Sequence, residues 1–294
     1  MNKPVRLICL TCLLLGISSY LLADRAHDLA SQAASQQAVN CDPTSLDSAT
    51  CHDQFPTGCS DAARPAYDAY LNFLKNQTPG PDVPSTTLLT GDDFLSLEDQ
   101  LHQLPGRLTS RNHARFASSL ADLNEGNIVT VIGYLYFAED TGKGSSRGTA
   151  FGETCNCKLQ LPGSFDYHLG LGFDAALAQQ ILTTKPQPDH NNPGDMEQMS
   201  VVAEMTPHTR HPKWTFGRVN SLQGRQVKVV GQLMVDNVHF NSKDDCNFPS
   251  SGPNCWRATV WEVHPVTQFY VCNLDGGCDQ SSPDSAWTSL DDLP

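Results

Sequence analysis

The chain has 294 residues, a length that suits one or two domains. Its formal net charge is −13, with 32 acidic against 19 basic residues. A surface this acidic repels phosphate backbones and anionic lipid, so the composition disfavours nucleic acid as a partner, although many extracellular proteins are acidic without any special role.

Residues 1–23 have the pattern of a secretory signal peptide. Lys3 and Arg6 supply the positive start, residues 7–22 are mostly apolar, and Ala23 offers a small residue for cleavage. No later stretch approaches the roughly 20 apolar residues that cross a bilayer. We therefore predict a secreted or periplasmic protein with no stable membrane insertion after cleavage; an uncleaved signal anchor is the alternative.

Residues 24–110 are predicted to form a cysteine-containing N-terminal arm that is rich in loops. Apolar residues at helical spacing predict short helices over residues 64–76 and 95–104. Between them, residues 78–84 form a Pro-rich linker that neither a helix nor a strand can cross.

Cysteine use agrees with export, because cysteines in an oxidising compartment usually form disulfides. Nine cysteines remain after the signal peptide: Cys41, Cys51, Cys59, Cys155, Cys157, Cys246, Cys255, Cys272 and Cys278. Close spacing predicts the disulfides Cys246–Cys255 and Cys272–Cys278. The Cys155-Asn-Cys157 segment either reaches the N-terminal trio or holds structural zinc. Because nine is an odd number, one thiol is free or intermolecular.

The rest of the chain is predicted to be mainly β. Five segments have strand patterns: residues 128–137, 165–171, 200–206, 226–236 and 258–271. One helix is predicted over residues 211–222, between the third and fourth strands. Gly133 and Gly231 lie inside the first and fourth strands, where glycine permits a bend.

This order predicts a five-stranded OB-like Greek-key barrel over residues 111–272. Strongly curved strands need a glycine or a bulge to turn the corner of a barrel. A generic small barrel or sandwich is the alternative. Residues 273–294 are predicted as an acidic C-terminal tail.

Six motifs, of which the last is the most specific, carry a resemblance to a known family: Thr130-Val-Ile-Gly-Tyr134, Cys155-Asn-Cys157, Asp166-Tyr-His-Leu169, Val202-Ala-Glu-Met-Thr-Pro207, His211-Pro-Lys-Trp214 and Trp261-Glu-Val-His-Pro-Val266. With these motifs, residues 111–271 resemble a family of uncharacterised, mostly bacterial OB-fold proteins. The resemblance implies the fold and brings no established activity.

Polar side chains gather on one predicted face of three strands. Strand alternation places His168 opposite the apolar face of the second strand, Glu204 opposite that of the third, and Glu262 with His264 on one face of the fifth. The second and third strands of an OB barrel pair, and the third lies near the fifth on closure. We therefore expect these four side chains to form one outward surface cluster.

Three further histidines are candidates for the same cluster. His208 and His211 follow the third strand, and His239 leaves the fourth. Imidazoles and carboxylates bind Zn²⁺ and other divalent transition metals, and they also form acid–base pairs.

The leading hypothesis is an extracytoplasmic OB-fold protein that presents this His/Glu cluster to a small ligand, a divalent metal or a protein partner. The alternative is a metal-dependent hydrolase of the phosphodiesterase or nuclease type. In it one histidine, His168 or His264, accepts a proton, a metal or Arg210 stabilises an anion, and Glu204 is a further catalytic candidate. A second alternative is an envelope interaction protein that binds through its arm and tail. Against all three stands a structural role, with Glu204 in an ordinary surface ion pair with Arg210 or Arg257.

Overall fold

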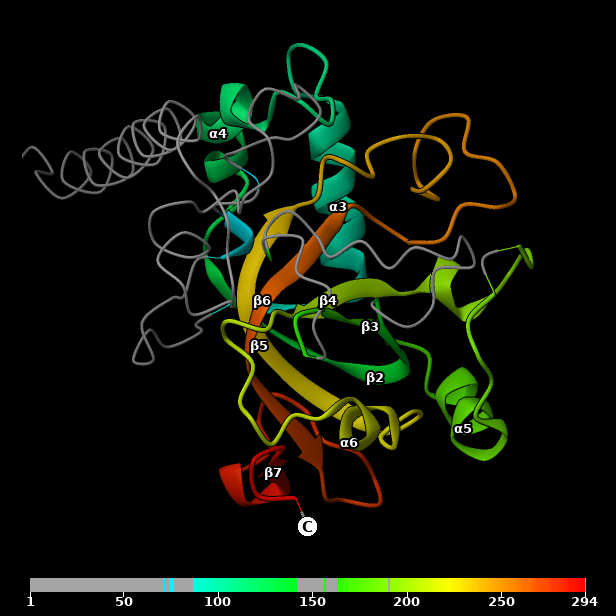
Figure 1. Ribbon diagram of the computed structural model, residues 1–294. Coiled ribbons are helices and arrows are strands. Elements are labelled where there is room, and N and C mark those ends of the chain that lie inside the picture. The colour runs from blue at the N-terminus through cyan, green and yellow to red at the C-terminus, as the bar shows by residue number, and fades with distance from the viewer. Residues whose placement is uncertain are drawn as a thin grey trace, which may run out of the picture.

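The computed structural model describes residues 71, 74–76, 87–141, 156, 163–189 and 191–293 (Figure 1). The predicted signal peptide, most of the predicted arm and five cysteines lie outside the described residues: Cys41, Cys51, Cys59, Cys155 and Cys157. Among the described residues, no helix is both long enough and apolar enough to cross a membrane.

The described strands are β1 (Thr87–Leu89), β2 (Ile128–Asp140), β3 (Tyr167–Gly172), β4 (Val201–Met205), β5 (Gln226–Val235), β6 (Trp261–Cys272) and β7 (Trp287–Ser289). The described α-helices are α3 (Gly91–His102), α4 (His113–Asp122), α5 (Ala175–Thr184) and α6 (Phe216–Asn220). Two short 3-10 helices are η2 (Met196–Met199) and η3 (Asp284–Ala286).

Five of these strands close into a barrel. The order is β2–β3–β4–β6–β5, and β5 pairs back onto β2. The neighbours β4 and β6 are parallel, and the other neighbours in the barrel are antiparallel. All five predicted strands are present, so the prediction of a mainly β fold with a closed five-stranded barrel is confirmed.

Two glycines lie where strands of the barrel come closest. A Cβ on Gly133 of β2 would lie 2.8 Å from the carbonyl oxygen of Gly172, and a Cβ on Gly231 of β5 would lie 2.4 Å from that of Pro265. The β5–β6 register also shifts next to Gly231. These are the positions at which the sequence predicts a bend, and a side chain at either would force the strands apart.

The barrel interior is apolar because alternate residues of each strand point inward. Val131, Leu169, Ala203, Val229 and Val263 are fully buried members of one core. Hydrophobic burial at about 25 cal/mol per Å² makes this interior the main source of stability. The residues between these positions point to the outer side of the barrel wall, where the polar side chains lie.

A second layer covers part of that outer side. Leu71 and Leu74 pack on Met234 of β5, together with Ala114 and Ala117 of α4. In Figure 1, α3 and α4 lie at one end of the barrel and β7 lies at the opposite end. The outer side of β5 around Met234 is therefore covered rather than solvent-facing, and this layer matters for the site.

The helix between β4 and β5 is shorter than predicted. The sequence predicted a helix over residues 211–222, whereas α6 begins only after Thr215, whose side chain accepts a hydrogen bond from the backbone N–H of Arg218. The preceding residues form a turn in which the Trp214 N–H donates to the His211 carbonyl. The N-cap therefore lies at Thr215 rather than near His211.

The segment predicted as a C-terminal tail packs on the barrel. β7 pairs with β6, and both Trp287 and Leu290 are buried. The predicted disulfides Cys246–Cys255 and Cys272–Cys278 are both present. The second joins the end of β6 to the loop that leads to β7.

Candidate functional site

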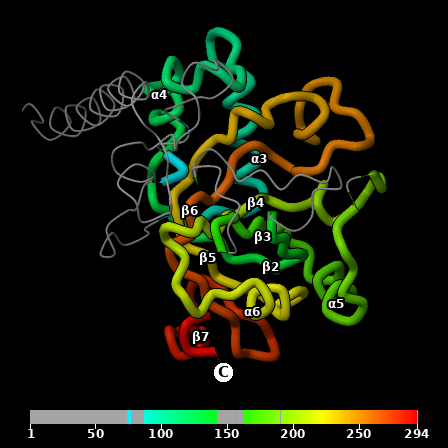
Figure 2. The backbone as a smooth tube through the Cα atoms, in the orientation of Figure 1, coloured from blue at the N-terminus to red at the C-terminus, as the bar shows by residue number. Residues whose placement is uncertain are grey.

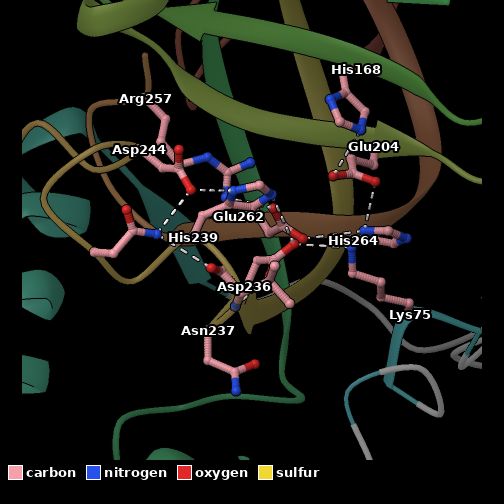
Figure 3. A network of polar contacts seen from close by, with 12 residues as sticks. Lys75, His168, Glu204, Asp236, Asn237, His239, Asp244, Arg257, Glu262 and His264 are labelled. Atoms are coloured by element: carbon pink, nitrogen blue, oxygen red, sulfur yellow. Dashed lines mark hydrogen bonds and ion pairs between the residues drawn. The ribbon is translucent and has the colours of Figure 1, made fainter. Parts of the chain in front are cut away.

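The structure brings together the four polar side chains singled out on the second, third and fifth barrel strands. His168 of β3 lies directly opposite Glu204 of β4, and β4 runs beside β6, which carries Glu262 and His264. All four alternate with residues of the apolar core and lie on the outer side of the wall. We call His168, Glu204, Glu262 and His264 the barrel-wall cluster (Figure 3).

Glu204 lies between two imidazoles. Its Oε1 is 3.2 Å from His168 Nε2, and its Oε2 is 3.1 Å from His264 Nδ1. The same His264 Nδ1 is 3.2 Å from Glu262 Oε1. A ring nitrogen between two carboxylates must carry a proton. The other nitrogen, His264 Nε2, is 2.7 Å from Thr206 Oγ1.

The expectation that this cluster is presented at the surface was wrong for three of its members. Glu204 is 1 % exposed, and Glu262 and His264 are 0 % exposed; only the side chain of His168, at 18 %, reaches solvent. The outer layer explains the difference. Gln232 Nε2 donates to the carbonyl oxygens of both Leu74 and His264, which ties this layer to β6.

Buried cations balance the carboxylates of the cluster and its neighbours. Lys75 Nζ is 3.0 Å from Asp236 Oδ2, and Arg257 Nη1 is 3.4 Å from Glu262 Oε2. Arg257 is fully buried, so it does not form the surface ion pair with Glu204 that the sequence suggested. A buried ion pair is tolerated only when its partners are close and hydrogen-bonded.

The charges hold each other in the ionised state. Burial alone would raise the pKa of Glu204, but His168 and His264 outweigh it and hold this pKa well below its usual value. Burial would lower the pKa of His264, but Glu204 and Glu262 raise it to about 10. The pKa of Asp236 is likewise lowered, because Lys75 and His239 outweigh the effect of burial. His264 is therefore an imidazolium at neutral pH.

The other predicted histidines lie apart from Glu204. His208 Nδ1 is 2.5 Å from Asn76 Oδ1, and the half-exposed His211 is 3.3 Å from Asp291. His239 is 3.1 Å from Asp244 and 3.9 Å from Asp236, so it touches the edge of the charge network (Figure 3).

Arg210 is occupied by backbone carbonyls. Its Nη1 donates to the carbonyl oxygens of Phe165 and Met205, and its Nη2 donates to that of Gly163. Its guanidinium lies 3.7 Å from the centre of the Tyr167 ring. These hydrogen bonds hold the loop before β3 against the end of β4. Because the Arg210 guanidinium is engaged by these carbonyls, it is not positioned to bind an anion.

Asp166 completes a set of donor atoms that could hold a metal ion. One donor atom from each of Asp166, Glu204 and His264 lies within 4.8 Å of the others, and all three residues are buried. Asp166 directly precedes β3 and belongs to the motif that contains His168. Three protein ligands with room for a further ligand are the usual number at a catalytic or exchangeable zinc site.

Sequence analysis missed the balancing charges. Lys75 lies in a segment predicted only as part of a helix, and Asp236 was assigned only as the end of a strand. Lys75 and Asp236 lie far apart in the sequence, so their pairing could not be predicted from spacing. The sequence shows only that each is an ionisable residue beside an apolar run.

The chain was compared with protein-family models, with curated proteins and with solved structures, and none of these comparisons gave a match. The function is therefore argued below from the side chains themselves.

Proposed function

We propose that the chain is an exported OB-type barrel protein that binds a divalent transition metal at the barrel-wall cluster together with Asp166. The strand order, the parallel β4–β6 pair and the position of α6 between β4 and β5 support the OB-type assignment. Two disulfides support export, since such bonds persist in oxidising compartments.

The observation that carries the metal proposal is the convergence of Asp166, Glu204 and His264 within 4.8 Å. Two carboxylates and one imidazole suit Zn²⁺ or Mn²⁺. His168 Nε2 lies 3.2 Å from Oε1 of the same Glu204 carboxylate, the position from which an outer partner orients a metal ligand. The motifs that carry the resemblance to the OB-fold family supply all four of these residues.

A metal ion must compete with the proton on His264. With a pKa of about 10, removing that proton at pH 7 costs about 4 kcal/mol. Zinc-finger peptides gain about 10–16 kcal/mol on binding zinc, so a cost of this size does not by itself prevent zinc from binding. Binding then releases one proton, and the affinity rises with pH until His264 is deprotonated.

A hydrolase that uses the same cluster is less well supported. Its anion would need a cation nearby, and the guanidinium of Arg210 is bound to the carbonyls of Gly163, Phe165 and Met205. Glu204, Glu262 and His264 are buried, and only the side chain of His168, at 18 %, reaches solvent, so the cluster offers a poor approach to a phosphodiester substrate. We therefore propose binding rather than catalysis.

The test uses untagged protein stripped with EDTA and titrated with Zn²⁺ and Mn²⁺ by calorimetry, with bound metal counted by elemental analysis. Glu204→Gln should lose one bound ion and should release one proton fewer than the wild type. His211→Gln is the matched control, because it removes an exposed imidazole elsewhere. Near-UV circular dichroism shows that each variant is folded.

The proposal fails if Glu204→Gln keeps every ion that the wild type binds. In that case the barrel-wall cluster is a structural ion-pair network, which its charge balance also permits.

A further inference from the structure

A second group of ligand-type side chains lies where α3 meets the segment between β5 and β6. Glu98 and His102 are four residues apart on α3 and so share one face of the helix. Asp245 approaches them from the position directly before the loop that the Cys246–Cys255 disulfide closes. One donor atom from each residue lies within 4.8 Å of the others. We call these three residues the α3 cluster; Figure 2 shows α3 beside this loop.

The donor atoms of the α3 cluster are buried, and their only polar neighbours among the described residues are one another. Glu98 Oε1, His102 Nε2 and Asp245 Oδ2 have no hydrogen-bond partner outside the cluster in the part of the chain that the structure describes. Glu98 is 1 % exposed and Asp245 is 0 % exposed. His102 Nε2 lies 3.4 Å from Glu98 Oε1. Buried polar atoms in native proteins are normally paired, so three such atoms that face one another without an outside partner point to a shared proton or a bound cation.

The remaining oxygens of the two carboxylates are held firmly. Glu98 Oε2 accepts hydrogen bonds from Thr259 Oγ1 at 2.6 Å and from the Val260 N–H at 3.1 Å. Asp245 Oδ1 accepts one from the Asn247 N–H at 2.9 Å. One oxygen of each carboxylate is therefore fixed by hydrogen bonds, and the other oxygen is left to face the rest of the α3 cluster. Hydrogen bonds from outer residues orient metal ligands in the same way.

The electrostatics of this point favour a cation. Burial and the neighbouring Asp245 carboxylate raise the pKa of Glu98 to about 8, and burial raises that of Asp245. Arg257 acts on Asp245 from a distance, but its Nη1 lies 3.4 Å from Glu262 in the barrel-wall cluster. Two like charges in a dry site need either a shared proton or a cation.

A cavity of about 400 Å³ gives access to His102. Phe240, Asn241, Ser242 and Phe248 line it on the side of the loop. The His102 ring lies 4.9 Å from the ring of Phe240 and 5.5 Å from that of Phe248, measured between centroids, which fixes its orientation. His102 is the member of the α3 cluster that lines this cavity, so the cavity lies on the side of the cluster closest to solvent.

We infer that Glu98, His102 and Asp245 form a second binding site for a divalent transition metal of the Zn²⁺ class, independent of the barrel-wall cluster. The imidazole and the small number of ligands disfavour Ca²⁺, which takes six to eight oxygens. Three protein ligands would leave a further position on the metal for water or for a small anionic ligand.

The experiment titrates the metal-free full chain with Zn²⁺ and follows the ¹⁵N resonances of its histidine rings. The His102 Nε2 resonance should shift on binding. His102→Gln and Asp245→Asn should each weaken one zinc site more than about 100-fold, since even outer partners are worth about 10- to 100-fold. Asp99→Asn is the matched control, because it removes an exposed carboxylate from the same turn of α3.

Glu204→Gln should leave the His102 shift intact, which separates this site from the proposed function. The inference is overturned if the His102 resonance does not move, or if His102→Gln binds zinc as the wild type does. The partly exposed His102 can be replaced without emptying the core, so that variant decides the matter even where Asp245→Asn does not fold. Glu98 and Asp245 would then share a proton.

Discussion

The barrel-wall cluster and the α3 cluster are both buried, but they differ in how their charges are balanced. In the first, the carboxylates of Glu204 and Glu262 face the imidazolium of His264 at 3.1 and 3.2 Å. In the second, Glu98 and Asp245 face each other, with His102 at 3.4 Å from Glu98 and with Arg257, which pairs with Glu262, acting on Asp245 from a distance. A buried carboxylate with a cationic partner stays ionised, whereas one without such a partner takes up a proton or a metal ion.

The largest expected effect is on the pH dependence of stability. The pKa of Glu98 rises from 4.5 to about 8 on folding, so the folded state holds a proton that the unfolded state loses between these values. The free energy of unfolding should therefore fall as pH rises from about 4.5 to 8, by at most about 5 kcal/mol. Urea denaturation in EDTA at several pH values measures this fall.

Glu98→Gln is the control for that measurement, because the amide cannot ionise. Its stability should lack the fall, and saturating Zn²⁺ should remove the fall from the wild type. The barrel-wall cluster responds in other ranges. His264, whose pKa is raised to about 10, loses its contribution as pH rises from 6.5 to about 10, and Glu204 loses its contribution only in acid. Equal pH profiles for the wild type and Glu98→Gln would show that Glu98 titrates normally.

The next largest effect is expected from Lys75→Met. This change leaves Asp236, 3.0 Å away and buried, without its nearest cation. Breaking a buried ion pair from one side costs about 3–5 kcal/mol, measured by urea denaturation at pH 7. Lys213→Met, which removes an exposed lysine, should cost less than about 0.5 kcal/mol. A loss below about 1 kcal/mol for Lys75→Met would mean that His239 or Arg257 compensates Asp236.

The sequence predicted the barrel well because strand patterns and glycines are local signals. Val201, Ala203 and Met205 alternate with Val202 and Glu204, and that parity placed Glu204 on the outer side of the wall. Its burial was not predictable, since it depends on Leu71, Leu74 and Lys75, more than a hundred residues away in the chain. The structure brings these segments together through packing that no short pattern records.

The α3 cluster illustrates the same limit. Glu98 and His102 have the spacing of two ligands on one helical face, and this signal was available in the sequence. Their partner Asp245 lies in a loop, and only the neighbouring disulfide suggests that the loop is ordered. A pair at positions i and i+4 is common on exposed helices, so the pattern becomes informative only when burial and the third residue are known.

The smallest effect concerns the disulfide beside the α3 cluster. Asp245 directly precedes Cys246, whose bond to Cys255 closes a loop with a sequence separation of 9. Replacing both cysteines by serine should cost roughly 2–3 kcal/mol through the entropy of the unfolded chain. It should also weaken zinc binding at the α3 cluster, because the loop that carries Asp245 becomes less ordered. Calorimetry and the His102 resonance report that change.

The second disulfide provides a matched control. Cys272–Cys278 closes a loop of similar size, with a sequence separation of 6, next to β7 at the far end of the barrel. Its double serine variant should lose about 2 kcal/mol and should bind zinc as the wild type does. Unchanged zinc affinity in both variants would mean that the hydrogen bond from the Cys246 N–H to the Arg257 carbonyl, at 2.9 Å, positions Asp245 without the disulfide. A drop in the first variant alone would tie the metal affinity of the α3 cluster to an oxidising compartment.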